Sequence, residues 1–249
     1  MPDNPSLTDQ DRAFYEWQFD VPGFGEAGQL TLRNTTALVT RLGGLGGPIA
    51  FALAAAGIGK LILAHGGNLE PSDLNRQILM RHDDLGKLRV ESAAATLRAF
   101  NPHIKVEAIA SHVTEDNAAD LVNKADIVFD AAPRFTERFW LNRECVAQGK
   151  PMIDAAMYNM EGQITVIVPG VTPCLACLYP EEPVNWKRRF PVIGAVSAMI
   201  GNMAVLEGIK LLTGLGKPAL NEIIYVDTLT MNLRKIAVTR RSNCPICQS

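Results

Sequence analysis

The sequence predicts an α/β protein in which helices flank a mostly parallel, Rossmann-like sheet, and three observations support this prediction. From about residue 35 onward, short apolar segments alternate with longer amphipathic ones, which is typical of strand–helix–strand units. The first apolar segment leads into a glycine-rich loop and then a helix-like segment, as in nucleotide-binding folds. The 249 residues are 47% hydrophobic and 20% charged, a composition that fits a soluble globular protein and excludes a disordered or fibrous one.

The expected elements follow from these patterns in chain order. Short apolar runs predict strands, and longer amphipathic or apolar runs predict helices. The helix that begins at Phe135 closes with Gly149, which is a C-cap signal. The expected strands are 35–40, 60–65, 105–110, 126–132, 151–158, 163–170, 223–228 and 234–240, and the expected helices are 49–57, 83–99, 135–149 and 192–213.

The chain divides at two places where its pattern changes. Residues 1–33 are expected to form an N-terminal helical arm of mixed charge, and residues 34–249 a single domain. Within that domain, 34–150 is the nucleotide-binding half. The second half, 151–249, is expected to continue the same sheet with an antiparallel part and to carry a structural zinc site.

The charge of the chain is close to balanced. Lys and Arg together number 24 and Asp and Glu 26, so the net charge of −2 gives no bulk reason to expect nucleic acid or a membrane as partner. The polar, acidic N-terminal segment does not resemble a signal peptide, so we expect a cytoplasmic protein. The apolar stretch 192–212 is about long enough to span a bilayer, but its polar residues favour a buried helix.

Four of the five cysteines form two C-x-x-C pairs, Cys174 with Cys177 and Cys244 with Cys247. Four soft ligands in this spacing suit a tetrahedral zinc ion with no open position, and therefore a structural one. The alternative is two unrelated reactive or buried pairs. A redox role is less favoured because neither pair is expected to open a helix after a strand. Cys145 is expected to be a buried, inert thiol.

The glycine-rich loop, 41–48, follows a strand and opens a helix, where backbone N–H groups can bind an anion. Its glycines Gly43, Gly44 and Gly46 are the candidates for close approach to a phosphate. A dinucleotide site would require an acidic residue at the end of the next strand, but that strand ends in His65-Gly66-Gly67. An ordinary NAD-dependent dehydrogenase is therefore not favoured.

Longer segments carry a resemblance to a known superfamily. GGLGGPIAFALAAAGIGKLIL, SDLNRQIL, GKLRVESAAATLRAFNPH, FDAAPRFTERFWLNREC and the two cysteine pairs together resemble the ThiF/MoeB/ubiquitin-activating superfamily over about 7–247. LAHGGN and FYEWQFDV resemble its HesA branch, whose genes accompany nitrogen fixation clusters. The resemblance implies a homodimeric, zinc-bearing ThiF/MoeB-like domain related to ATP-dependent adenylyltransferases. It further implies a role in maturing the nitrogenase iron–molybdenum cofactor with cofactor-assembly proteins, with molybdenum as the expected cargo.

The resemblance also assigns candidate site residues. Arg76 matches a phosphate-binding arginine, with Asn75 and Gln77 on the same loop, and Arg89 falls at the usual catalytic lysine, two residues after Lys87. Arg76, Arg89 and Asp130 are the expected catalytic residues, Asp130 as the remaining candidate to hold a divalent ion. The expected nucleotide-binding residues are Arg41, Gly43, Gly44, Gly46, His65, Asn75, Arg76, Gln77, Lys87 and Arg89.

The chain departs from the superfamily pattern in a consistent direction. His65, Gly67 and Pro133 stand where acidic residues are usual, and Arg41 and Arg134 add positive charge. This predicts an anion-seeking pocket with less capacity for Mg²⁺, which could bind ATP by its phosphates or an oxyanion such as molybdate.

Two further positions lack the usual residue. Trp17 stands where a partner subunit usually supplies an arginine, and we expect it to pack under the arm rather than stack on adenine. No cysteine lies near Lys187, where several members form an acyl intermediate.

Three functions remain open from the sequence. The first is a HesA-like, ATP-linked accessory protein of nitrogen fixation. The second is an adenylyltransferase that activates the C-terminus of a ubiquitin-like sulfur carrier protein. The third is a binding module without turnover. Whether ATP is hydrolysed, used for adenylylation or only bound does not follow from the sequence.

Overall fold

A single sheet of eight strands organises the computed structural model, which describes residues 6–181 and 191–248. The strand order is β3-β2-β1-β4-β5-β6-β7-β8. The chain moves outward from β1 to β3 and then returns to the other side of β1 with β4. This reversal places a crevice at the carboxyl ends of β1 and β4, where α/β proteins commonly bind ligands.

The sheet has a parallel half and an antiparallel half, as the sequence predicted. The parallel pairs join the first five strands, and the antiparallel pairs add the last three. The parallel strands are β1 (Thr36–Thr40), β2 (Lys60–Ala64), β3 (Lys105–Ile109), β4 (Ile127–Asp130) and β5 (Met152–Tyr158), and the antiparallel ones are β6 (Glu161–Ile167), β7 (Glu222–Asp227) and β8 (Asn232–Ala237).

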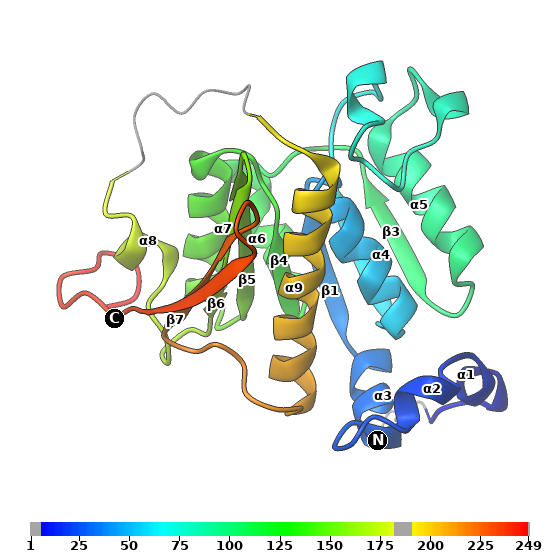
Figure 1. Ribbon diagram of the computed structural model, residues 1–249, viewed down its shortest axis with the longest axis horizontal. Helices are drawn as coiled ribbons and strands as arrows, with labels where there is room; N and C mark the ends of the chain where they lie inside the picture. Colours follow the sequence, from blue (N-terminus) through cyan, green and yellow to red (C-terminus); the bar gives the residue numbers. More distant parts are fainter. Residues whose placement is uncertain (1–5, 182–190, 249) are drawn as a thin grey trace.

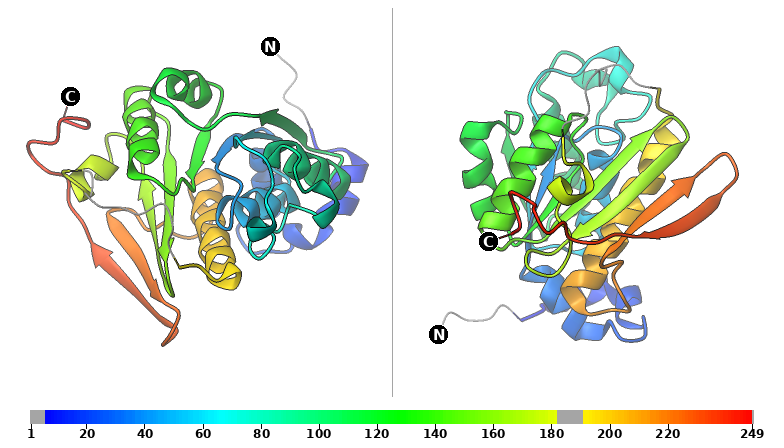
Figure 2. Two further views of the ribbon diagram at one scale, coloured as in Figure 1. Left: turned by 90° about the horizontal axis from the view of Figure 1, so that it is seen from above. Right: turned by 90° about the vertical axis from the view of Figure 1, so that its left-hand side faces the viewer.

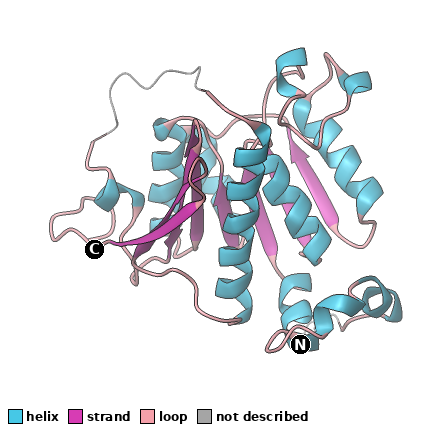
Figure 3. Ribbon diagram, in the orientation of Figure 1, coloured by secondary structure: helices cyan, strands magenta, loops and turns pink. Residues whose placement is uncertain are grey.

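Helices cover both faces of the sheet, so the strands lie in a middle layer (Figures 2 and 3). One face is covered by α4 (Gly46–Ala56), α5 (Arg89–Phe100) and α9 (Gly194–Thr213), and the other by α6 (Glu115–Asn123) and α7 (Phe135–Ala147). Successive strand residues point to opposite faces. Val39 and Phe129 accordingly belong to the core under α4 and α9, while Leu38 and Val128 belong to the core under α6 and α7.

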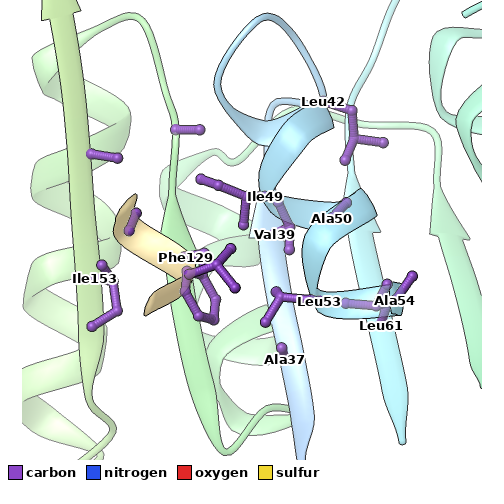
Figure 4. Packing of buried hydrophobic residues seen from close by; sticks show 14 of the residues in the cluster. Ala37, Val39, Leu42, Ile49, Ala50, Leu53, Ala54, Leu61, Phe129 and Ile153 are labelled. Carbon is purple, nitrogen blue, oxygen red and sulfur yellow. The ribbon is translucent and has the colours of Figure 1, made fainter. Parts of the chain in front are cut away.

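The core under α4 shows why the central parallel strands β1, β2 and β4 are largely apolar. Figure 4 shows Ile49 and Leu53 of α4 beside the sheet, with Phe129 of β4 close by, and all three side chains are fully buried. Because parallel strands buried on both faces have no solvent side, their sequences are continuous apolar runs.

The long helix α9 is apolar and long enough to cross a membrane by length and composition alone. In this fold it packs against α4, β5 and β6. Its Glu207 is buried, accepts the backbone N–H of Ala219 at 2.8 Å and pairs with Lys210. The expectation of a core helix is therefore confirmed.

Three short helices precede the sheet: α1 (Asp9–Phe14), α2 (Glu16–Phe19) and α3 (Gly25–Arg33). They lie beyond the amino ends of the parallel strands (Figure 1). Tyr15 anchors them, since its buried hydroxyl accepts the Asn101 side-chain N–H at 2.7 Å. The expectation that Trp17 packs under this arm is wrong, because its side chain is 85% exposed.

Candidate functional site

A cavity of about 420 Å³ opens at the carboxyl ends of the parallel strands. Its walls come from the loops after β1, β2 and β4, from the start of α5, from the β5–β6 hairpin, and from the short helix α8 (Leu175–Leu178). Of the expected nucleotide-binding residues, those that line it are Arg41, Gly43, Gly44, His65, Arg76, Gln77 and Arg89. The motif residues from separate parts of the sequence are thus brought together.

Four of the expected catalytic and nucleotide-binding residues do not line this cavity: Gly46, Asn75, Lys87 and Asp130. Asn75 is exposed and accepts a hydrogen bond from the neighbouring Arg76. The Lys87 side chain is 64% exposed and pairs with Asp84 at 2.7 Å. The segment around Lys187 lies outside the described residues.

The glycine loop is shaped by close backbone packing. A Cβ at Gly46 would lie 2.3 Å from the carbonyl oxygen of Arg41, and one at Gly44 would lie 2.6 Å from Ser197 Oγ of α9. At Gly43, by contrast, a Cβ would meet nothing within 4 Å. Gly46 and Gly44 are therefore needed for the loop itself, whereas the open space at Gly43 leaves room for a ligand.

The side chain of Arg41 is held by Glu137 and His112. Arg41 adopts the left-handed backbone conformation, with φ of 58°, which a non-glycine residue rarely does. Its Nε donates to Glu137 Oε2 of α7 at 2.7 Å, a second guanidinium nitrogen pairs with the same carboxylate, and Nη1 lies 2.9 Å from His112 Nε2. The charge of Arg41 is thus balanced within the protein.

Asp73 lies beside two further arginines of the cavity, Arg76 and Arg89. Its Oδ2 accepts from Arg89 Nε at 2.8 Å and lies 2.7 Å from Nη2, and its Oδ1 accepts from Gln77 Nε2 at 2.6 Å. Arg76 Nη2 lies 3.7 Å from the same carboxylate. Asp73 ends the 3-10 turn η1 (Pro71–Asp73) and is only 5% exposed.

The hypothesis of a pocket poor in carboxylates therefore requires correction. Asp73, Asp154 and Glu161 line the cavity, and Glu137 neutralises Arg41 from behind. Arg134 is exposed and does not line it. The acidic residues are supplied by different chain positions from the usual ones, so comparing single positions along the sequence did not find them.

His65, at the end of β2, is a buried imidazole at the cavity wall. It is 6% exposed, and its Nδ1 has no hydrogen-bond partner in the described part of the chain. Burial, together with the charges of Arg41 and Arg89, lowers the pKa of His65 to about 3. The ring is therefore neutral at pH 7 and can exchange hydrogen bonds with a ligand without carrying charge.

Asp130 does not line the cavity and lies beside the guanidinium of Arg138. Its Oδ1 accepts from Thr40 Oγ1 at 3.1 Å and from the Ala132 N–H at 2.9 Å. Arg138 Nη1 of α7 stands 3.6 Å from Asp130 Oδ2 and 2.5 Å from Asp154 Oδ1. This geometry does not favour a divalent ion on Asp130, because Asp130 does not line the cavity and a cation, Arg138, already lies beside its carboxyl group.

The Asp130 and Asp154 carboxyls form a buried pair with Arg138. Burial raises the pKa of Asp130 to about 7, with a further contribution from Asp154 that acts against Arg138. Sequence reasoning missed Arg138 and Asp154. The available signal was an acidic residue within each of two adjacent apolar strands, Asp130 at the end of β4 and its register partner Asp154 in β5.

The four paired cysteines come together as expected. Their Sγ atoms lie within 4.8 Å of one another, with Cys174 and Cys244 separated by 3.6 Å and Cys177 and Cys247 by 3.4 Å. Four buried thiols at such distances fit a tetrahedral zinc ion about 2.3 Å from each sulfur. The expectation that neither cysteine pair opens a helix is wrong for the first pair, because Cys174 is the N-cap of α8. A loop separates this helix from β6. Cys145 is buried in the core, and burial raises its pKa.

The chain is similar to known proteins along nearly its whole length. The HesA protein of heterocysts from Trichormus variabilis is 48% identical over 97% of this chain and 91% of its own length. The sulfur carrier protein adenylyltransferase of Thermus thermophilus is 33% identical over 94% of this chain and 89% of its own. Crystalline E. coli MccB with ATP shares the fold, with a TM-score of 0.82, 23% identity and coverage of 98% of this chain and 83% of that one. The ThiF family model matches residues 15–246, and the chain therefore belongs to the ThiF family.

Proposed function

We propose that this chain binds ATP in the cavity and acts as a HesA-like accessory protein of nitrogen fixation. In this proposal it aids maturation of the nitrogenase iron–molybdenum cofactor by delivering or inserting molybdenum. The observation that carries ATP binding is the convergence of Gly43, Arg76 and Arg89 on one cavity at the switch point of the sheet. The role in nitrogen fixation is supported by the HesA proteins, which are 46–48% identical to this chain.

The cavity offers two kinds of contact to a triphosphate. The open space at Gly43 lets backbone N–H groups approach phosphate oxygens, and the guanidinium groups of Arg76 and Arg89 supply positive charge. Asp73 and Asp154 are engaged by arginines, so these two carboxylates offer little to Mg²⁺. A divalent ion that arrives with ATP is therefore expected to be held chiefly by the phosphates.

A calorimetric titration of ATP tests this proposal, carried out with and without Mg²⁺ and molybdate. We expect ATP to bind, and molybdate to change that affinity or to compete with it. Arg76→Ala should weaken ATP binding about tenfold, because a charge-assisted hydrogen bond to phosphate is lost. The matched control is Arg134→Ala, since Arg134 is exposed outside the cavity. Equal ATP affinity under every metal condition would remove the metal-delivery role.

A second candidate is activation of the C-terminus of a ubiquitin-like sulfur carrier protein. The observation that favours it is the 33% identity to a sulfur carrier protein adenylyltransferase. Release of pyrophosphate in the presence of a carrier protein would select this function, whereas release of phosphate would support the first. The absence of nucleotide binding would favour a binding module without turnover.

The proposal includes a zinc ion and a second copy of the chain. Cys174, Cys177, Cys244 and Cys247 would hold the zinc, which supplies no open position for chemistry and clamps the C-terminal segment to the loop after β6. The functional unit is proposed to be a cytoplasmic homodimer that works with cofactor-assembly proteins. Sedimentation of the purified protein tests the dimer.

A further inference from the structure

Asp73 occupies an unusual place for a carboxylate, because it lines a cavity proposed to bind an anion. It is 5% exposed and accepts hydrogen bonds from the Glu70 N–H at 3.0 Å and from Gln77 Nε2 at 2.6 Å. Two nitrogens of Arg89 bind the same Oδ2 atom, at 2.8 Å and 2.7 Å. A negative charge at this wall repels an anionic ligand. Its presence is explained if the carboxylate orients the Arg89 guanidinium, which attracts the ligand.

The position of Arg89 explains why it needs such a partner. Arg89 is the first residue of α5, and a cation at a helix N-terminus is disfavoured by the helix dipole. Its side chain is 15% exposed, so it retains little water to compensate its charge. Asp73 supplies this compensation and at the same time fixes the direction of the guanidinium group.

Gly67 provides the space on the other side of the same guanidinium. A Cβ at Gly67 would lie 2.7 Å from Arg89 Nη1, and the residue has φ of +84°, which favours glycine. Gly67, Arg89 and Asp73 therefore form one interlocking arrangement. The Nε and Nη2 atoms are bound by Asp73, and the Nη1 side lies in the space that Gly67 leaves.

We propose that Asp73 is a positioning residue that acts through Arg89, presenting the Nη1 side of the guanidinium to a phosphoryl group of the ligand. This inference rests on the proposed binding of a phosphate-bearing ligand in the cavity. It assigns Asp73 no contact with the ligand. It also implies that position 89 requires an arginine and not only a positive charge. A lysine has a single nitrogen and cannot bind Asp73 through two nitrogens while a third faces the ligand.

The sign of one substitution separates positioning from simple charge. Asp73→Asn keeps the shape of the side chain and an acceptor for the Glu70 N–H, but removes the negative charge. If Asp73 acted only through its charge, its loss would tighten binding of an anion. If Asp73 positions Arg89, Asp73→Asn weakens binding although the cavity becomes more positive. We expect the Kd for ATP to rise about tenfold.

A double-mutant cycle sharpens this test. Arg89→Lys should weaken ATP binding about tenfold. In the Arg89→Lys background, Asp73→Asn should no longer weaken binding and should instead leave it unchanged or tighten it, because the guanidinium that Asp73 binds through two nitrogens is gone. Asp83→Asn is the matched control: it makes the same charge change on the same loop, at a side chain that is 99% exposed.

Calorimetry with ATP and, in parallel, with inorganic tripolyphosphate distinguishes the inference from the proposed function. Tripolyphosphate binding without ATP binding would contradict the proposed function alone, and the cycle is then evaluated with tripolyphosphate. Tighter binding by Asp73→Asn, or equal effects in both backgrounds, would overturn the positioning role. Binding of neither ligand by the wild-type protein would overturn both proposals.

Unfolding curves show whether Asp73→Asn folds. If it does not, a second variant, Arg89→Ala, still tests the inference. In Arg89→Ala, the Asp73 carboxylate remains as a receptor for a free guanidinium ion. Millimolar guanidinium should then restore a large part of ATP binding in Arg89→Ala but not in Arg76→Ala. Equal restoration in both, or in neither, would contradict the inference.

Discussion

Replacing Asp130 by asparagine should remove a pH-dependent cost from the folded protein. Asp130 is fully buried beside Asp154 and Arg138, and its pKa is raised to about 7. Asparagine keeps Oδ1 as an acceptor for Thr40 and the Ala132 N–H, and offers an uncharged N–H group toward the Arg138–Asp154 pair. The variant therefore imitates the protonated form of Asp130 at every pH.

The sign and size of the effect follow from proton linkage. Between the ordinary carboxyl pKa of 3.8 and about 7, the folded state binds a proton at Asp130 that the unfolded state does not. Wild-type stability therefore falls as the pH rises through this window, by about 1.4 kcal/mol per pH unit from this group. Relative to Asp130→Asn, the wild type should lose about 2 kcal/mol of stability between pH 5 and pH 7, and less than about 0.5 kcal/mol above pH 7.

Urea unfolding of both proteins at pH 5, 6, 7 and 8 measures this difference, and zinc-dependent effects cancel because the proteins share the cysteine site. Asp83→Asn, at an exposed side chain, should run parallel to the wild type. If Asp130→Asn also ran parallel to the wild type across this range, Asp130 would not hold a proton in the folded state and the reasoning would fail.

Three other predictions concern the metal site, the loop and the core. Cys247→Ser should abolish stoichiometric zinc content and lower the Tm, whereas Cys145→Ala should keep the zinc; retained zinc in Cys247→Ser would contradict the site. Gly46→Ala should destabilise the fold by about 1–3 kcal/mol in urea unfolding, because its Cβ would meet the Arg41 carbonyl oxygen at 2.3 Å, while Gly43→Ala should leave stability unchanged. Phe129→Ala should cost about 3–5 kcal/mol by the same measurement, and a loss under about 1 kcal/mol would show that the core collapses around the gap.

The central parallel strands β1, β2 and β4 were accessible from the sequence because they are buried on both faces. Continuous apolar runs such as 36–40 and 60–64 identify themselves without reference to their neighbours. Helix α6 was not predicted, because Glu115–Asn123 is short and polar and gains stability from packing on α7. The helix expected from 83 begins only at Arg89, since Gly86 adopts a left-handed conformation and interrupts it.

The sequence allowed several residues of the candidate site to be predicted, but not the contacts between them. Motif spacing brought out the glycine loop, Arg76 and Arg89, but their partners were missed. The Arg41–Glu137 and Arg138–Asp154 pairs join residues from different elements, so no local pattern records them. Charge balance at a site depends on tertiary contacts, and a residue-by-residue comparison therefore overestimated the positive charge of this cavity.

The four-residue helix α8 belongs to two sites at once. Cys174 and Cys177 hold it at the cysteine cluster, while Leu175 and Tyr179 line the cavity. The Leu175 N–H donates to Asn142 of α7 at 2.8 Å, and α7 also carries Arg138. A displacement of α8 therefore moves two cysteines of the cluster and a wall of the cavity together. The proposed zinc site and the proposed nucleotide site therefore share α8, and any coupling between zinc affinity and nucleotide affinity must be equal in both directions.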